Sequence, residues 1–268
     1  MRAYLTYSMD KDVRHRASTG GFCKEFIRYS LENKIVDKAI ITVLGEGREA
    51  LSPTTIITDD ISIIMSTKSN TIYDKTNPLS VLKQLGNEKY IFVGLPCHIR
   101  PMKLYCERKG ISVLTVSLFC NHLSKSYYQS VLDKVGLTKE EVIHFEYRGS
   151  GWAGYVKIVT DSGEIKIDHH ECWDNYSKNV NMLSKCKRCK EMVSLDADIC
   201  VGDAWIQSVM DNDKEGTCIT VAMNNNANQL VIDAYEHGYI HMDKMNTEAF
   251  AMYCRNITDY KIMRSKNE

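Results

Sequence analysis

The stretch from residue 90 to residue 135 constrains the fold most, because short apolar runs alternate there with segments of helical periodicity. Residues 90–93 form a predicted strand, and the turn Gly94-Leu-Pro-Cys97 leads into a predicted helix at residues 98–108. A second apolar run at residues 111–119 ends at Cys120, and another predicted helix follows at residues 124–135. A strand–helix–strand order favours parallel pairing of the two strands. We therefore expect an α/β fold with a parallel βαβ core in a mixed sheet.

The rest of the chain adds strands and helices around this core. A helix is expected to begin at Phe22, and Pro78 suits the first turn of a helix at residues 79–85. Further helices are expected at residues 228–236 and 247–253, and a polar loop at residues 10–19. Strands are expected at residues 2–7, 36–44, 54–57, 61–65, 142–147, 154–159, 164–167 and 219–222. The pattern predicts one compact unit over residues 1–268, more antiparallel in its C-terminal part.

The composition argues against nucleic-acid binding, secretion and insertion into a membrane. Lysine plus arginine and aspartate plus glutamate number 34 each, so no global charge attracts nucleic acid. The N-terminus shows no apolar segment typical of a secretory signal, and the longest apolar runs are too short to span a membrane. A cytoplasmic location follows as an expectation. There the ten cysteines would stay reduced and would not form a disulfide framework.

Four of these cysteines stand in positions suited to chemistry. Cys97 and Cys120 each follow an apolar strand, and the carboxyl ends of adjacent parallel strands lie side by side. Cys186 and Cys189 form a Cys-x-x-Cys pair among lysines and an arginine. Four thiolates can hold a 4Fe–4S cluster or a structural zinc, whereas the pair alone could also form a redox disulfide. The other cysteines are interpreted as structural, and His169-His170 as a polar strand end.

A second group of residues suggests a ligand of another kind. Ser18, Thr19, Gly20 and Gly21 precede a predicted helix, and Arg14 adds positive charge, so the loop could bind a phosphate or pyrophosphate. A plain helix N-cap explains the same residues.

Two further turns also carry residues that suit a ligand. The turn from Arg148 to Trp152 offers a cation and a flat ring, although an ordinary hairpin loop fits it equally. Gly202-Asp203 follows an apolar strand, a common place for a ligand to meet backbone.

Together these motifs resemble the coenzyme F-420 hydrogenase/dehydrogenase beta-subunit family. The similarity runs in the family's order from about residue 3 to residue 240. The matching segments are Arg14 with Gly20-Gly21, the helix end and strand at residues 29–37, Val-Gly-Leu-Pro-Cys-His at 93–98, Phe119-Cys120, the Arg-x-x-Gly-Trp turn at 148–152, and Cys186 through Trp205.

The resemblance implies a flavoprotein with a 4Fe–4S cluster held at the four cysteines. FAD is implied near the Gly-Gly loop and the Arg148–Trp152 turn, and the strand ending in Gly202-Asp203 is expected to lie against the flavin. Electrons would pass between cluster, FAD and an external carrier, which in the namesake enzymes is the deazaflavin coenzyme F-420.

Two departures from the family pattern bear on partners. No cysteine precedes Cys23, so a ferredoxin-like N-terminal segment is absent from the sequence. A redox partner protein or ferredoxin, or a nicotinamide or deazaflavin carrier, is then expected to supply the electrons. The loop at residues 18–21 resembles bacterial relatives associated with surface-polysaccharide genes. Alternatives from other classes are a zinc-stabilised, non-catalytic binding module and a thiol–disulfide enzyme using Cys186 and Cys189.

Overall fold

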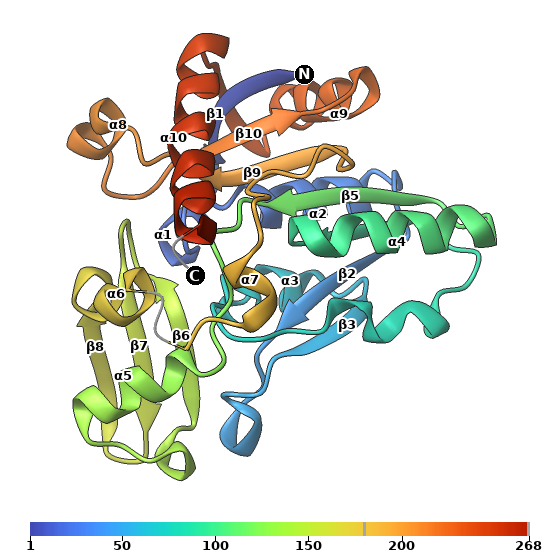
Figure 1. Ribbon diagram of the computed structural model, residues 1–268. Coiled ribbons are helices and arrows are strands. Elements are labelled where there is room, and N and C mark those ends of the chain that lie inside the picture. Colours follow the sequence, from blue (N-terminus) through green and yellow to red (C-terminus); the bar gives the residue numbers. More distant parts are fainter. Residues whose placement is uncertain (179–180, 267–268) are drawn as a thin grey trace.

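The structure, a computed structural model, describes residues 1–178 and 181–266. A large mixed sheet dominates it (Figure 1). In spatial order its strands are β11 (Ile240–Lys244), β1 (Arg2–Ser8), β10 (Cys218–Ala222), β9 (Ile199–Asp203), β5 (Val113–Leu118), β4 (Tyr90–Gly94), β2 (Lys38–Val43) and β3 (Thr54–Thr58).

The four central strands are parallel, and those on either side are antiparallel. β2, β4, β5 and β9 pair in parallel, whereas β3 pairs antiparallel with β2 and the run β9–β10–β1–β11 is antiparallel throughout. The predicted strand–helix–strand unit is β4, α4 (Pro96–Lys109) and β5. The expected α/β class, with a parallel core and a more antiparallel C-terminal part, is confirmed.

Helices cover both faces of this sheet. On one face, α2 (Phe22–Glu32), α3 (Ile61–Met65) and α9 (Asn225–Glu236) bury apolar side chains against the strands. On the other face lie α4, η3 (Pro78–Gln84) and α10 (Thr247–Lys266). β4 shows why two layers form, because Ile91 packs toward α2 while Tyr90 and Phe92 pack toward α4.

A smaller antiparallel sheet lies beside the carboxyl ends of the parallel strands (Figure 1). It consists of β6 (His144–Gly149), β7 (Tyr155–Thr160) and β8 (Gly163–Asp168). α5 (Tyr127–Val135) and α6 (His169–Ser177) share an aromatic core with it. The remaining elements are α1 (Lys11–Arg16), α7 (Ser184–Lys187), α8 (Gln207–Asn212) and the short 3-10 turns η1 (Gly47–Glu49), η2 (Thr67–Ser69) and η4 (Lys139–Glu141).

Several local expectations were wrong. The polar loop at residues 10–19 contains α1, which Asp10 caps by accepting hydrogen bonds from the amides of Asp12 and Val13. The strand expected at residues 61–65 is α3, because Asp60 caps it and Ile64 reaches the core. His169 begins a helix and does not end a strand, and the segment after Pro78 is a 3-10 helix. β11, α6 and α8 were not anticipated.

Candidate functional site

The four predicted cysteine ligands come from three segments that meet beyond the ends of β4 and β5. Cys97 lies in the first turn of α4, Cys120 follows β5, Cys186 lies in α7, and Cys189 comes just after that helix. Burial raises the pKa of the Cys120 thiol to about 12, with smaller contributions in the same direction from the nearby thiols of Cys186, Cys97 and Cys189 and an opposing one from the Lys261 charge. Cys186 and Cys189 act in the same direction on the pKa of Cys97. The fold therefore brings all four thiols into one neighbourhood.

The thiols do not converge as ligands of a single ion do. None of the four forms a disulfide bond. Within residues 1–178 and 181–266, no group of three or more His, Cys, Asp or Glu side chains is arranged to hold a metal ion. Single-zinc sites need four sulfurs or nitrogens about 2.0–2.3 Å from one centre.

A buried lysine stands among these thiols. Lys261 on α10 has no exposed surface, and its ammonium donates hydrogen bonds to the carbonyl oxygens of Cys120, at 2.9 Å, and of Glu191. The Cys189 sulfur lies 3.8 Å from the same nitrogen. The amide of Cys120 also donates to the carbonyl of Met192 at 3.1 Å, which ties Cys120 to the chain after the Cys-x-x-Cys pair.

The side-chain amide of Asn70 holds the glycine loop, residues 18–21, between the two sheets. Asn70 donates to the carbonyl of Arg16 at 2.8 Å and to that of Arg148 at 3.2 Å. Ser18 donates to the Arg148 carbonyl at 3.2 Å and accepts from the amide of Thr71. These bonds fix the loop against the end of β6.

The two glycines of that loop differ in their roles. Gly21 caps α2 with a φ of 79°, a conformation that side chains other than glycine rarely adopt. Gly20 lies against the large sheet, where a Cβ would come within 3.0 Å of Cys218 and of the Thr6 carbonyl. Both positions therefore demand glycine, one for its backbone conformation and the other for close approach.

A cavity of about 540 Å³ opens between the glycine loop and the carboxyl ends of the parallel strands. This volume lies within the roughly 300–1,000 Å³ typical of small-molecule sites. Of the site residues predicted from the sequence, those that line this cavity are Ser18, Thr19, Gly21, Cys120, Arg148, Gly202 and Asp203. Apolar residues from both helices and strands complete the wall: Phe22, Ile27, Ile41, Ile64, Val93 and Val201.

A buried ion pair closes one side of the cavity. The guanidinium of Arg148, 3% exposed, pairs with the carboxylate of Asp203 and also donates to the carbonyl of Ala153 at 2.7 Å. The Asp203 charge holds the pKa of Arg148 high despite its burial. Arg148 lies 5.2 Å from the ring centre of Trp205, which packs at a tilt against Trp152 with the ring centres 4.6 Å apart. Trp152 thus supports the wall through Trp205.

Arg14 turns away from the cavity. It lies 3.6 Å above the ring of Tyr7 and is bonded to the carbonyl of Gly216 and the carboxylate of Asp213. These contacts anchor α1, and the predicted ligand role of Arg14 stays a prediction. Gly20, Trp152, Cys97, Cys186 and Cys189 also lie outside the cavity wall.

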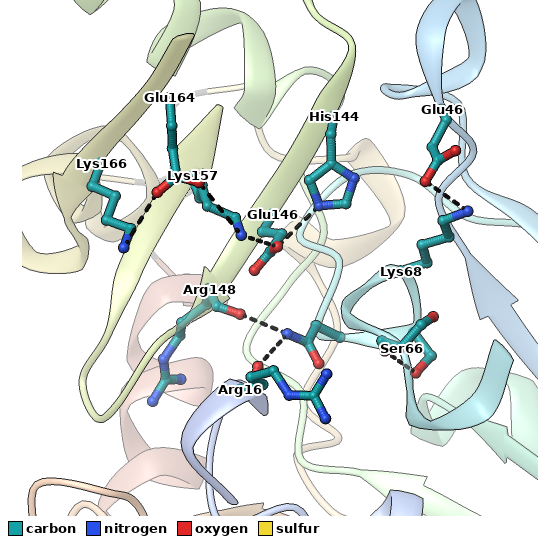
Figure 2. A network of polar contacts seen from close by, with 12 residues as sticks. Arg16, Glu46, Ser66, Lys68, His144, Glu146, Arg148, Lys157, Glu164 and Lys166 are labelled. Atoms are coloured by element: carbon teal, nitrogen blue, oxygen red, sulfur yellow. Dashed lines mark hydrogen bonds and ion pairs between the residues drawn. The ribbon is translucent and has the colours of Figure 1, made fainter. Parts of the chain in front are cut away.

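The network beneath the loop sets the local charge. Figure 2 shows Glu146 on β6 bonded to His144 at 2.9 Å and to Lys157 at 2.8 Å. Burial raises the pKa of Glu146, but these hydrogen bonds and the Lys157 charge outweigh it and bring the pKa to about 2. Glu146 is therefore a permanent buried anion.

Two cavity residues have a depressed pKa and were not anticipated from the sequence. Burial lowers the pKa of Lys24, in the first turn of α2, to about 7, and its ammonium donates to the Ser66 carbonyl. Burial, with the Lys185 charge, lowers the pKa of His98 to about 4, so this imidazole is neutral at pH 7. Lys24 comes three residues after Gly21. Helical spacing alone could therefore have placed it one turn from the glycine loop.

Family models match both halves of the chain. The beta-subunit N-terminal model of coenzyme F420 hydrogenase/dehydrogenase matches residues 3–83, and the C-terminal model of the same beta subunit matches residues 87–248. A solved structure of the F420-reducing [NiFe] hydrogenase complex from Methanosarcina barkeri contains a chain with the same fold, with a TM-score of 0.73 at 18% identity. That match covers 100% of this chain and 90% of the other.

Characterised relatives are distant in sequence. The chain is 27% identical to a coenzyme F420-dependent sulfite reductase of Methanocaldococcus jannaschii over 68% of its own length, and it spans 30% of that protein. It is 24% identical to a coenzyme F420 hydrogenase subunit beta of Methanothermobacter thermautotrophicus, covering 74% of this chain and 72% of the relative. An F420-dependent formate dehydrogenase subunit beta of M. jannaschii is 22% identical over 93% of this chain and 63% of the relative.

Proposed function

Because this chain belongs to the coenzyme F420 hydrogenase/dehydrogenase beta-subunit family, we propose that it is an iron–sulfur flavoprotein oxidoreductase. One observation carries the proposal: Cys120 belongs to the group of four neighbouring thiols and also lines the cavity. A metal centre at the thiols and an organic cofactor in the cavity would therefore share a wall. Such adjacency is what electron transfer between two cofactors requires.

The cavity suits a large, mostly flat cofactor with an anionic part. Ile27, Ile41 and Ile64 supply an apolar surface at one end. Ser18, Thr19 and Gly21 line the cavity at the start of α2, whose N-terminal amides would hold the phosphate groups of FAD. Arg148 adds a fixed cation, and its Nη2 has no hydrogen-bond acceptor among the side chains and backbone that the structure describes. These residues fit FAD.

The thiol group fits a 4Fe–4S cluster better than zinc. The four cysteines form no disulfide and are neighbours that do not converge on a point, and the buried Lys261 ammonium lies beside two of them. A cluster of several irons spans more space than one ion, so this arrangement suits it. A zinc-stabilised binding module would need converged ligands and would leave the cavity unexplained. When bound, FAD would supply hydride exchange at its isoalloxazine ring, and the cluster would supply single-electron transfer.

In this proposal the protein's own residues bind and orient the two cofactors and shield them from water. Phe119 and Tyr253 cover Cys120 and Asp203 from the α10 side, and the hydroxyl of Tyr253 donates to the carbonyl of Asp203 at 2.7 Å. Leu95 and His98 separate Cys97 from the cavity, and the neutral His98 accepts the amide of Leu95 at 3.3 Å. This wall excludes water between the two cofactor positions.

The external carrier and partner are also part of the proposal. The relatives act with coenzyme F420, so a deazaflavin or a nicotinamide is the proposed hydride carrier. Lys185, Lys187 and Arg188 are exposed beside the thiols and suit an acidic redox partner protein such as a ferredoxin. A cytosolic location, where thiols stay reduced, agrees with this scheme. Within residues 1–178 and 181–266, no helix has the length and apolarity needed to cross a membrane.

A reductase role in surface-polysaccharide biosynthesis is an alternative use of the same cofactors. It rests on the sequence of the loop at residues 18–21 and differs only in the final acceptor.

The proposal is tested by anaerobic reconstitution with iron, sulfide and FAD. Wild-type protein should show flavin absorption with a broad iron–sulfur shoulder, and a reduced carrier should bleach both. Cys106→Ser is the matched control, because Cys106 is buried on α4 away from the four thiols. Cys120→Ser should lose the shoulder while the control keeps it. Equal spectra in the two variants would count against the proposed ligand set.

A further inference from the structure

Lys261 is a buried cation without an acidic partner. Its side chain belongs to α10, has 0% exposure, and is enclosed by the segments that carry Cys120 and Cys189. Two backbone carbonyls and one thiol sulfur are its hydrogen-bond acceptors. Among carboxylates whose side chains the structure describes, none forms an ion pair with it.

Burying the Lys261 ammonium costs free energy unless a nearby negative charge compensates it. A buried ammonium loses its hydration, and carbonyl dipoles offset only part of that loss. Neutral thiols cannot complete the compensation, whereas thiolates bound to iron carry the missing negative charge. Lys261 already contacts this site, since its nitrogen lies 2.9 Å from the Cys120 carbonyl oxygen and 3.8 Å from the Cys189 sulfur.

The position of Lys261 in the chain makes the contact informative. Residue 261 lies outside the ranges 3–83 and 87–248 that the family models match. The contact is made because α10 packs across the large sheet, with Phe250 buried in the core and Tyr253 bonded to the carbonyl of Asp203 (Figure 1). The helix thus delivers one cation to the centre of the thiol group.

We propose that Lys261 is the counter-charge of an anionic iron–sulfur centre bound by Cys97, Cys120, Cys186 and Cys189, and that it favours the reduced state of that centre. The inference rests on the proposed function. Reduction adds one negative charge, and a cation held a few ångströms away in a poorly hydrated site stabilises that charge more than the oxidised state. Lys261 is accordingly a positioning and tuning residue and takes no part in bond making.

The test compares Lys261→Met and Lys261→Arg with wild type after anaerobic reconstitution with iron and sulfide. Iron content is measured first, and then the reduced fraction during a redox titration followed by electron paramagnetic resonance. At the wild-type midpoint potential, Lys261→Met should lower the ratio of reduced to oxidised centre about tenfold or more. Lys261→Arg should stay close to wild type.

Lys185→Met is the matched control. Lys185 is exposed and acts on the pKa of Cys97, but water screens its charge. Its loss should change the ratio far less than the loss of Lys261.

Each outcome supports or overturns the proposed role of Lys261. Loss of iron in Lys261→Met with retention in Lys261→Arg would also support a charge requirement. An unchanged ratio in Lys261→Met, or loss of iron in both variants, would overturn the tuning role. Failure of wild-type protein to take up iron would instead refute the proposed function, so the two failures are distinguishable.

Discussion

Gly202→Ala should disturb the wall between the thiols and the cavity. Gly202 lies in β9, pairs with Ile219 of β10, and has no left-handed backbone conformation to lose. An added Cβ would come within 2.0 Å of Cδ2, 2.3 Å of Cγ and 2.7 Å of Cβ of Phe119. Since ordinary contact begins at 3.4 Å, the near edge of the ring must move by about 1.4 Å and the Phe119 Cβ by about 0.7 Å. Phe119 adjoins Cys120, so the candidate ligand should move with it.

The cost can be estimated from two opposing effects. Forcing an extra carbon into a packed site costs about 1–3 kcal/mol. Reduced freedom of the unfolded chain returns about 0.4–1 kcal/mol when glycine becomes alanine. The free energy of unfolding should therefore fall by about 1–2 kcal/mol. Gly86→Ala is the matched control, because its Cβ would meet the end of the Glu88 side chain, with Oε2 nearest at 2.5 Å, and moving that oxygen costs at most the hydrogen bond it accepts from Tyr90.

Urea unfolding of cofactor-free protein measures this difference, and iron and flavin content after reconstitution measures its effect on the site. Gly202→Ala should be less stable than wild type and should retain less iron, whereas Gly86→Ala should differ from wild type by less than about 1 kcal/mol. If Gly202→Ala matched wild type in both stability and iron content, the packing of Phe119 over Gly202 would be refuted.

Three further predictions concern charge and ligands. Asp203→Asn should lower the free energy of unfolding by about 3 kcal/mol, because it leaves Arg148 buried and unpaired, whereas Arg148→Met should cost less since the Asp203 side chain is 18% exposed; equal costs in urea unfolding would contradict this. The pKa of Glu146 is about 2 in the fold and about 4.3 in an unfolded chain, so its stabilising effect is complete above pH 4.3 and lost toward pH 2. Glu146→Gln should therefore destabilise by about 3 kcal/mol at pH 7 and by progressively less in acid, and a pH-independent difference in unfolding free energy would refute the assignment. Serine at both Cys186 and Cys189 should abolish iron binding but spare flavin, as measured by metal analysis and absorbance; iron retained at the wild-type level would exclude them as ligands.

The sequence predicted the parallel core because local and tertiary signals agree there. The apolar run at β4, the proline at the start of α4 and the apolar run at β5 each match what packing requires. The segment that became α3 misled because a short run of isoleucines fits strand or helix, and Asp60 as a cap decided it. β11 was missed because its pairing with β1 depends on residues more than two hundred positions away.

The site was predictable to the extent that it lies at strand ends. Cys97 and Cys120 could be placed together because parallel strands end at one edge of the sheet. Lys261 could not be found, since nothing in its local sequence indicates that α10 crosses to the thiols. The sequence also could not show that Arg14, a cation near a glycine loop, contacts Asp213 and Tyr7, because both partners depend on the tertiary fold.

A direct count of iron, acid-labile sulfide and FAD in anaerobically purified and reconstituted protein tests the central claim most directly. The account predicts about four irons, four sulfides and one FAD per chain, and little zinc. Zinc without iron or flavin, or protein that stays colourless after reconstitution, would contradict it.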